Sequence, residues 1–283
     1  MGNLRAVVRG LVLVPFLALV GLAVAAEEAP PIGLKTLVGF DKLPLLADWP
    51  VYQASSYSRQ NVNADADNFI RVEPNGEQVL AEAEGPGCIY RIWMTGVVEP
   101  NVPIQSSDDA RILMYFDGEE KPRIDLSVPE LFGLRHKSPF VPPLSRSFES
   151  GRGAWEGHAS ICYVPIPFEK SIKVTGKKMN FYHIDYCRFP AGTALKSFTM
   201  DVAPADRQIL EQAAKVFNAT GEDPKPRPAN AQQQSSPGEL APGAAREIVV
   251  DGPAVIDALW VKVDPPTHLA LRGLELQISF DGT

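Results

Sequence analysis

Short apolar runs separated by turn sequences dominate the middle of the chain. Six of these runs lie at residues 69–72, 78–81, 88–94, 111–116, 171–175 and 180–186. The segments between them are rich in Gly, Pro, Asn and Asp, the residues that tight turns favour. Many short strands without long helices between them predict an all-β fold, either an antiparallel sandwich or a jelly roll.

A single helix is predicted after these strands. Apolar residues recur at helical spacing over residues 204–218, where Pro204 suits the first turn and Gly221 follows the end. Residues 222–243 are rich in Pro, Gln, Ser, Ala and Gly and show no periodicity, which indicates a linker. We therefore expect a first jelly-roll domain at residues 34–200, followed by the helix and linker at residues 201–245.

An internal repeat follows the linker. Residues 84–94 align without gaps on residues 251–261, sharing a Gly-Pro pair, an Ile and a Trp, and residues 112–118 align on 276–282, sharing Phe-Asp-Gly. We interpret these as two copies of one β-unit, so residues 246–283 are expected to begin a second jelly roll. The first copy continues for about eighty residues past its Phe-Asp-Gly, which predicts that the second is incomplete and the sequence a fragment.

The two tryptophans that the repeat shares, Trp93 and Trp260, lie in apolar runs. Their equivalent positions predict core packing rather than ligand stacking.

The N-terminal residues 1–25 have the organisation of a secretory signal peptide. Arg5 and Arg9 precede an apolar run over residues 11–24, which ends in the small-residue motif Ala23-Val24-Ala25. An uncleaved N-terminal anchor is the alternative. We expect an exported protein, periplasmic or extracellular, that is soluble once the segment is removed.

Composition and charge exclude several classes of protein. The chain carries 27 basic and 34 acidic residues, a net charge of −7, which argues against nucleic acid as the main partner. Its 45% hydrophobic and 22% charged residues exclude a disordered chain. The histidines at positions 136, 158 and 183 have no metal-ligand spacing, so neither a metal nor a cofactor is expected.

The cysteines Cys88, Cys162 and Cys187 all lie in apolar, strand-like runs. Buried small hydrophobes are the favoured interpretation. A Cys162–Cys187 bridge across neighbouring strands remains open.

The run Ser55-Ser56-Tyr57-Ser58-Arg59, followed by Asn63, Asp65 and Asp67, resembles the opening motif of glycoside hydrolase family 172, a large bacterial family long described as a domain of unknown function. Further motifs occur in the family's order: Glu82-x-Glu84-Gly85-Pro86-Gly87, Ile92-Trp93-Met94-Thr95, Phe116-Asp117-Gly118-Glu119-Glu120-Lys121-Pro122, Pro129-x-x-Phe132-Gly133 and Tyr163-x-Pro165-Ile166-Pro167-Phe168. The resemblance covers residues 34–283. It implies a tandem jelly-roll fold, assembly into trimers, and retaining cleavage by two glutamates of difructose anhydride or of arabinofuranose-containing glycans.

The catalytic glutamates are not assigned within this chain. Retaining glycosidases need two carboxyl groups about 5–5.5 Å apart, and the resemblance places both in the second jelly roll, so we expect them beyond Thr283. Two other acidic pairs are better explained as solvated surface: Glu119 and Glu120 lie in a predicted hairpin turn, and Glu82 and Glu84 share one face of a strand. The chain alone is therefore expected to be inactive.

The opening motif is the candidate substrate-binding site. Sugar sites combine an aromatic platform with planar hydrogen-bonding groups, and the motif supplies both types in Tyr57, Arg59, Asn63, Asp65 and Asp67. The alternative is a loop held by its own Asx turns and an Arg59–Asp67 pair. The resemblance favours the sugar site, with Trp49 as a second platform.

Two functions remain open on the sequence. The first is a secreted glycoside hydrolase, or a piece of one, that acts on furanose-containing glycans such as fructofuranosides or arabinofuranosides. The second is a non-catalytic jelly-roll module that binds carbohydrate or builds a surface assembly. For the hydrolase, the expected partner is a carbohydrate. For the non-catalytic module, the partner is either a carbohydrate or the other subunits of a surface assembly.

Overall fold

The computed structural model describes residues 30–279 except positions 44, 46, 100–101, 149–158, 225–229, 255 and 257. The predicted signal peptide, His158 and Thr283 lie outside the described residues. Within the described part of the chain, no helix is long and apolar enough to cross a membrane.

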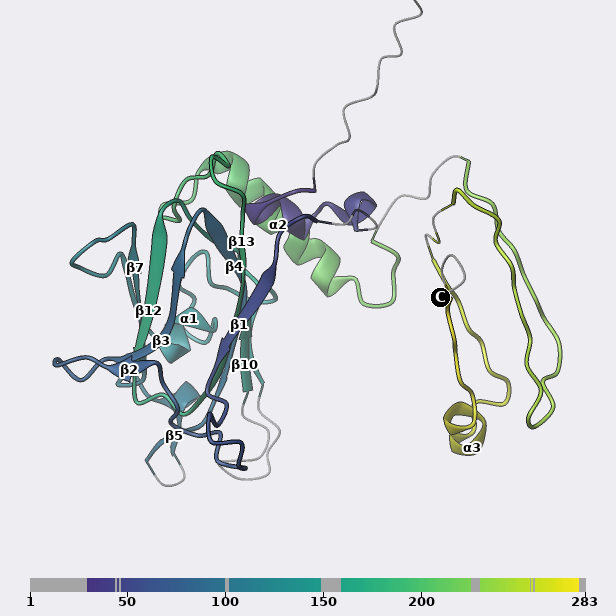
Figure 1. The fold of residues 1–283 in the computed structure, drawn as a ribbon, viewed down its shortest axis with the longest axis horizontal. Coiled ribbons are helices and arrows are strands. Elements are labelled where there is room, and N and C mark those ends of the chain that lie inside the picture. The colour runs from purple at the N-terminus through teal and green to yellow at the C-terminus, as the bar shows by residue number, and fades with distance from the viewer. Residues whose placement is uncertain are drawn as a thin grey trace, which may run out of the picture.

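Two antiparallel sheets form a β-sandwich (Figure 1). The six-stranded sheet has the order β1 (Val51–Ser55), β13 (Phe181–Arg188), β4 (Gly87–Thr95), β10 (Ala159–Cys162) and β9 (Ser145–Phe148), and β11 (Ile166–Phe168) also pairs with β4. The five-stranded sheet has the order β2 (Arg71–Val72), β3 (Gln78–Glu84), β12 (Ser171–Lys177), β7 (Arg111–Phe116) and β8 (Ile124–Ser127). A short hairpin joins β5 (Val97–Glu99) to β6 (Val102–Pro103). The predicted β-sandwich is confirmed, and its tandem jelly-roll form stays a prediction.

Alternate residues of the two sheets face each other and form the core. Ile92 and Met94 of β4 are buried in the same cluster as Met114 of β7 and Val174 of β12. Trp93 lies between the two buried β4 residues, so it points to the outer face and is only partly buried. The expectation that Trp93 packs in the core is therefore wrong.

The second glycine of the Gly85-Pro86-Gly87 motif is needed for packing. A Cβ added at Gly87 would lie 2.3 Å from Cζ of Phe168 and 2.5 Å from the carbonyl oxygen of Cys187. The Gly85-Pro86-Gly87 motif and the motif that ends at Phe168 are far apart in the sequence but meet where β4 begins. Close packing therefore accounts for Gly87 and Phe168 without a catalytic role.

Six helices of the described residues accompany the sandwich. They are η1 (Gly33–Leu37), η2 (Phe40–Lys42), η3 (Ile104–Ser106), α1 (Val128–Leu131), α2 (Pro204–Asn218) and α3 (His268–Arg272). Two of them contribute to its core: Val128 and Leu131 of α1 and Ile104 of η3 are fully buried there. The bounds of α2 are those that the sequence predicts. Its Ala213 is fully buried and its Leu210 packs against the core, while η1 lies alongside it.

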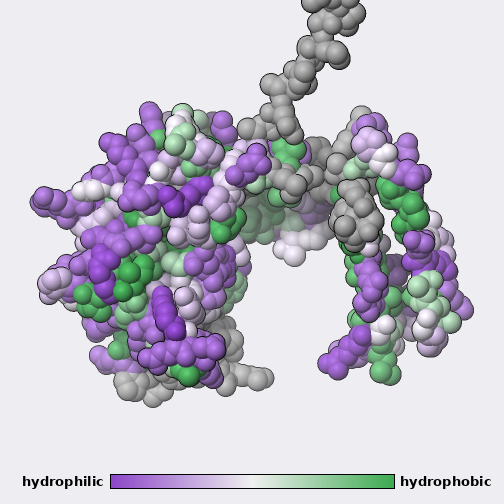
Figure 2. All heavy atoms as spheres, in the orientation of Figure 1, coloured by the Kyte–Doolittle hydropathy of each residue, from purple (hydrophilic) through white to green (hydrophobic). Residues whose placement is uncertain are grey.

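The C-terminal part of the chain, from residue 230 onward, is exposed where it is described. Residues 230–254, 256 and 258–279 contain the short helix α3 and no strand. Apolar side chains lie open on its surface (Figure 2), and Trp260 is 69% exposed, so the expectation that Trp260 packs in a core is wrong. The second jelly roll stays a prediction from the repeat.

The three cysteines are free and buried, which confirms the interpretation as small hydrophobes. Because β4 lies between β10 and β13, Cys162 and Cys187 are not neighbours, and the bridge between them does not form. Cys187 instead lies opposite Cys88. Burial raises the pKa of Cys162 to about 11.

Candidate substrate-binding site

The candidate site is the loop over residues 56–70, which begins where β1 ends. Ser56 fixes its start on β13: the Ser56 amide donates to the carbonyl of Tyr182 at 3.2 Å, and the Tyr182 amide donates to the Ser56 hydroxyl at 3.3 Å. The side-chain amide of Asn68 donates to the carbonyls of Ser56, Ala64 and Ala66 at 3.0, 2.7 and 3.1 Å. The loop is therefore braced from within, and no signal in the sequence pattern indicates the part that Asn68 plays.

Tyr57 and Arg59 form the exposed part of this loop. Tyr57 is 56% exposed, and the guanidinium carbon of Arg59 lies 4.4 Å from the centroid of its ring. Nη1 of Arg59 donates to the carbonyl of Tyr57 at 2.9 Å, and Nη2 donates to the carbonyl of Ser55 at 3.1 Å. These partners are neutral. Within the described part of the chain no carboxylate forms an ion pair with Arg59.

The two predicted aspartates have different surroundings. Asp65 accepts a hydrogen bond from the amide of Ser58 at 2.9 Å, which closes the loop beside Arg59. Asp67 has a left-handed backbone, with φ of 59°, and its carboxylate accepts a 2.9 Å hydrogen bond from Asn180. Since Arg59 binds main-chain carbonyls and Asp67 binds Asn180, the Arg59–Asp67 pair considered as an alternative does not form.

Asn63 and Trp49 complete the predicted set. Asn63 is exposed on the same loop. Trp49 lies at the other end of β1. Its ring contacts that of Phe189 edge-on, with the ring centroids 5.2 Å apart, beside the buried Cys88 and Cys187. The structure thus brings Tyr57, Arg59 and Asp65 together, attaches Asp67 to Asn180, and places Trp49 elsewhere.

Tyr182 lies beneath this loop and is a residue that the sequence analysis did not single out. Its side chain is fully buried, and its hydroxyl donates to the carbonyl of Asn68 at 3.1 Å. Burial raises the pKa of Tyr182, and the neighbouring Arg59 offsets part of that rise. Arg59 therefore lies between a buried phenol and the exposed ring of Tyr57.

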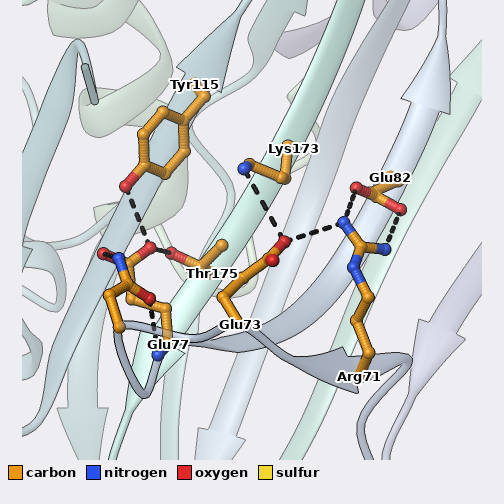
Figure 3. A network of polar contacts seen from close by, with 8 residues as sticks. Arg71, Glu73, Glu77, Glu82, Tyr115, Lys173 and Thr175 are labelled. Carbon is orange, nitrogen blue, oxygen red and sulfur yellow. Dashed lines mark hydrogen bonds and ion pairs between the residues drawn. The ribbon is translucent and has the colours of Figure 1, made fainter. Parts of the chain in front are cut away.

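Carboxylates are concentrated on the five-stranded sheet, where they serve structure (Figure 3). Arg71 binds Glu82 at 2.6 Å and Glu73 at 2.8 Å, and Lys173 lies 3.9 Å from Glu73. The hydrogen bond from Arg71 is the main reason that the pKa of Glu82 is lowered. A general acid needs a raised pKa, so Glu82 is unsuited to that role and the surface interpretation of Glu82 fits.

Glu77, on the same sheet, is 5% exposed and fully hydrogen-bonded. It accepts from the Tyr115 hydroxyl at 2.9 Å, the Thr175 hydroxyl at 2.7 Å and the Asn75 amide at 2.9 Å. Burial alone raises the pKa of Glu77, but the hydrogen bonds from Thr175 and Tyr115, together with the charge of Lys177, leave it below its usual value. This carboxylate is held ionised as a structural anchor.

The Glu119 turn matches the surface interpretation. Glu119 binds Arg123, with Nε to Oε1 at 3.0 Å, and Arg123 also donates to the carbonyl of Phe198 at 3.1 Å. These contacts attach the hairpin turn between β7 and β8 to the segment before α2. Among the described residues, no group of three or more His, Cys, Asp or Glu side chains is placed to hold a metal ion.

A comparison with protein families identifies the family of the chain. The family model of the GH172 first beta-sandwich domain matches residues 47–206, a range that runs from just before β1 to the first residues of α2 and includes the whole candidate loop. No curated protein matches the chain.

Proposed function

The chain belongs to the GH172 family of glycoside hydrolases, and from that premise we propose that it acts, as an enzyme or as part of one, on furanose-containing glycans such as fructofuranosides or arabinofuranosides. The observation that carries the proposal is the family match over residues 47–206. The match does not favour the non-catalytic module.

The loop at the end of β1 is the proposed sugar contact. Tyr57 offers an exposed ring for an apolar sugar face, and Arg59 lies against that ring. A guanidinium has five N–H donors, and Arg59 uses Nη1 and Nη2 on two carbonyls, so further N–H groups remain for sugar hydroxyls. Asp65 and Asn63 add acceptors and donors nearby, while Asp67 acts through Asn180 as a positioning residue.

Cleavage is proposed to be retaining, with a glutamate nucleophile and a glutamate acid/base. Neither role is assigned to three glutamates of the first sandwich: Glu77 and Glu82 are held ionised and bound by structural partners, which does not suit a general acid, and Glu119 is bound to Arg123. The task of the first sandwich is then to position the sugar ring, not to break the bond.

Export and assembly are further parts of the proposal. The N-terminal 25 residues have the charge pattern and cleavage motif of a signal peptide. We propose that the protein is periplasmic or extracellular and that the full-length enzyme forms trimers.

The test measures hydrolysis and its stereochemistry. The 283-residue chain, and a longer product if the reading frame continues, are each assayed with aryl arabinofuranosides and with difructose anhydride. We expect turnover by the longer product with retention of anomeric configuration in proton NMR, and none by the 283-residue chain. Inversion would refute the retaining mechanism, and turnover by the 283-residue chain would return Glu119 and Glu120 to consideration.

A further inference from the structure

One row of side chains crosses the outer face of the six-stranded sheet. The strand register aligns five residues on neighbouring strands, in the order Ser55, His183, Trp93, Ile161 and Arg146. The adjacent residues in β4 and β13 point into the core, so this row points away from it, although Ser55 at its end is only 6% exposed. Five strands spaced about 4.8 Å apart give the row a length of roughly 19 Å.

The centre of the row is aromatic. The rings of Trp93 and His183 lie side by side with centroids 5.0 Å apart, tilted by 39°, and both side chains are partly exposed. An indole beside an imidazole gives a flat surface on which the apolar face of a sugar ring can pack.

An arginine over an exposed aromatic ring lies at each end of the row. At one end Arg146 is 4.4 Å from the centroid of Phe148, which is 41% exposed. At the other end Arg59 lies 4.4 Å from the centroid of Tyr57 and binds the carbonyl of Ser55. The row, together with Phe148, Tyr57 and Arg59, is called the outer-sheet platform below.

Within the described residues, neither of these two arginines forms an ion pair with a carboxylate. Among the other described arginines, Arg71, Arg111 and Arg123 form ion pairs with carboxylates, and on this sheet Arg91 pairs with Asp185 at 2.8 Å. Arg188, at the end of β13, donates instead to the carbonyl of Glu84. The contacts of Arg146 and Arg59 are aromatic rings and carbonyls, with no carboxylate among the described residues. In a chain with a net charge of −7, two such cations on one face indicate an anionic ligand.

We propose that the outer-sheet platform binds an acidic polysaccharide, a glycan whose sugar rings carry carboxylates, laid across the strands. One ring packs on Trp93 and His183, and carboxylates on neighbouring rings meet Arg59 and Arg146. Arg146 lies outside the proposed furanose contact, and a neutral glycan would offer its guanidinium no anionic partner. This inference rests on the proposed function in taking the ligand to be a carbohydrate, and the two share Tyr57 and Arg59.

The test measures binding without turnover. The purified 283-residue chain is titrated with polygalacturonate by isothermal calorimetry, and with dextran as a neutral comparison. Each titration is run at about 20 mM and at about 500 mM NaCl, which lie below and above the range where salt screening becomes strong. We expect polygalacturonate to bind at low salt and weaken at high salt, because screening shortens the reach of surface charges, and we expect dextran not to bind.

Variants locate the site. Trp93→Ala is expected to weaken polygalacturonate binding about five- to twentyfold through lost stacking, and Arg146→Gln about two- to fivefold, as exposed ion pairs contribute modestly. Arg111→Gln, an arginine on the five-stranded sheet, is the matched control and should bind as the parent does. Melting temperatures confirm folding, and His183→Ala replaces Trp93→Ala if the latter does not fold.

Three results would overturn the inference: no polygalacturonate binding at low salt, equal binding by the Trp93 and Arg111 variants, or stronger binding of dextran. A changed sedimentation coefficient for Trp93→Ala with unchanged binding would instead identify this face as a contact between copies of the chain. Because calorimetry requires no hydrolysis, this inference and the proposed furanosidase activity succeed or fail separately.

Discussion

Replacing Glu77 by glutamine tests whether this buried carboxylate anchors the five-stranded sheet. Its three hydrogen-bond donors come from β7, β12 and the turn before β3, so one side chain holds three segments together (Figure 3). Glutamine has nearly the same shape but keeps only one acceptor oxygen and adds a donor. The new side-chain NH2 would therefore either face the NH2 group of Asn75, donor against donor, or require the two hydroxyls to accept where they now donate.

The magnitude follows from the kind of hydrogen bond lost. Bonds to a charged group contribute about 1.5–3 kcal/mol each, and leaving a buried group unsatisfied costs about 1–3 kcal/mol. Since part of the network survives, we expect Glu77→Gln to lower the free energy of unfolding by about 2 kcal/mol, a fall in melting temperature of roughly 4–8 °C for a chain of this size. The matched control is Glu73→Gln, which weakens a surface network and should cost much less.

The loss should also depend on pH. The pKa of Glu77 is lower in the folded state than its ordinary value, so its ionised form stabilises the fold above about pH 4.3, the unfolded pKa, and that contribution disappears as the pH falls through the folded pKa. The difference in melting temperature between the parent and Glu77→Gln should be largest at about pH 6–7 and shrink toward about pH 3. Equal melting temperatures for Glu77→Gln and the parent at neutral pH would refute this account of the anchor.

Three other predictions concern packing, the thiols and processing. Gly87→Ala should lower the melting temperature by several degrees, because its Cβ would overlap Phe168 and the Cys187 carbonyl, and differential scanning calorimetry showing an unchanged value would contradict the packing argument. Iodoacetamide should label none of the three cysteines in the native protein and all of them after unfolding, because burial raises the pKa of each thiol. Rapid labelling of the native protein, detected by mass spectrometry, would disprove their burial. Protein recovered from an exporting host should begin at Ala26 or Glu27 by intact-mass analysis, and a retained Met1 on soluble cytoplasmic protein would overturn export.

The sequence pattern was most informative where periodicity is local. The spacing of apolar residues predicted α2 with the bounds Pro204–Asn218 and β7 with the bounds Arg111–Phe116. Strand β1 was missed because its residues Val51–Ser55 alternate little in polarity and lead directly into a motif interpreted as chemistry. Trp93 was misplaced because the expectation rested on its equivalence to Trp260 in the repeat. Arg91 and Thr95, which share its face of β4, are polar and indicate an outer face.

Contacts between distant residues were beyond the reach of the sequence. The hydrogen bond of Asp67 to Asn180 joins residues 113 positions apart, and nothing in the local pattern indicates it. The sequence could not decide whether Cys162 and Cys187 form a bridge for a similar reason, because only the strand order shows that β4 separates them. The candidate loop was found because its residue types are unusual together, while its internal bracing by Asn68 became visible only in the fold.

The most direct test of the central claim measures two quantities for Arg59→Ala: its specificity constant for a furanoside and its melting temperature. The substitution is made in the protein that hydrolyses the furanoside. Losing a donor to a sugar hydroxyl should lower kcat/KM roughly ten- to a hundredfold. Because Arg59 is exposed and binds main-chain carbonyls, the melting temperature should stay within a degree or two of the parent, as it should for the control Arg111→Ala, which keeps full activity. A large fall in melting temperature with normal kcat/KM per folded molecule would show that Arg59 only holds the loop, and would remove Tyr57 and Arg59 from the substrate site.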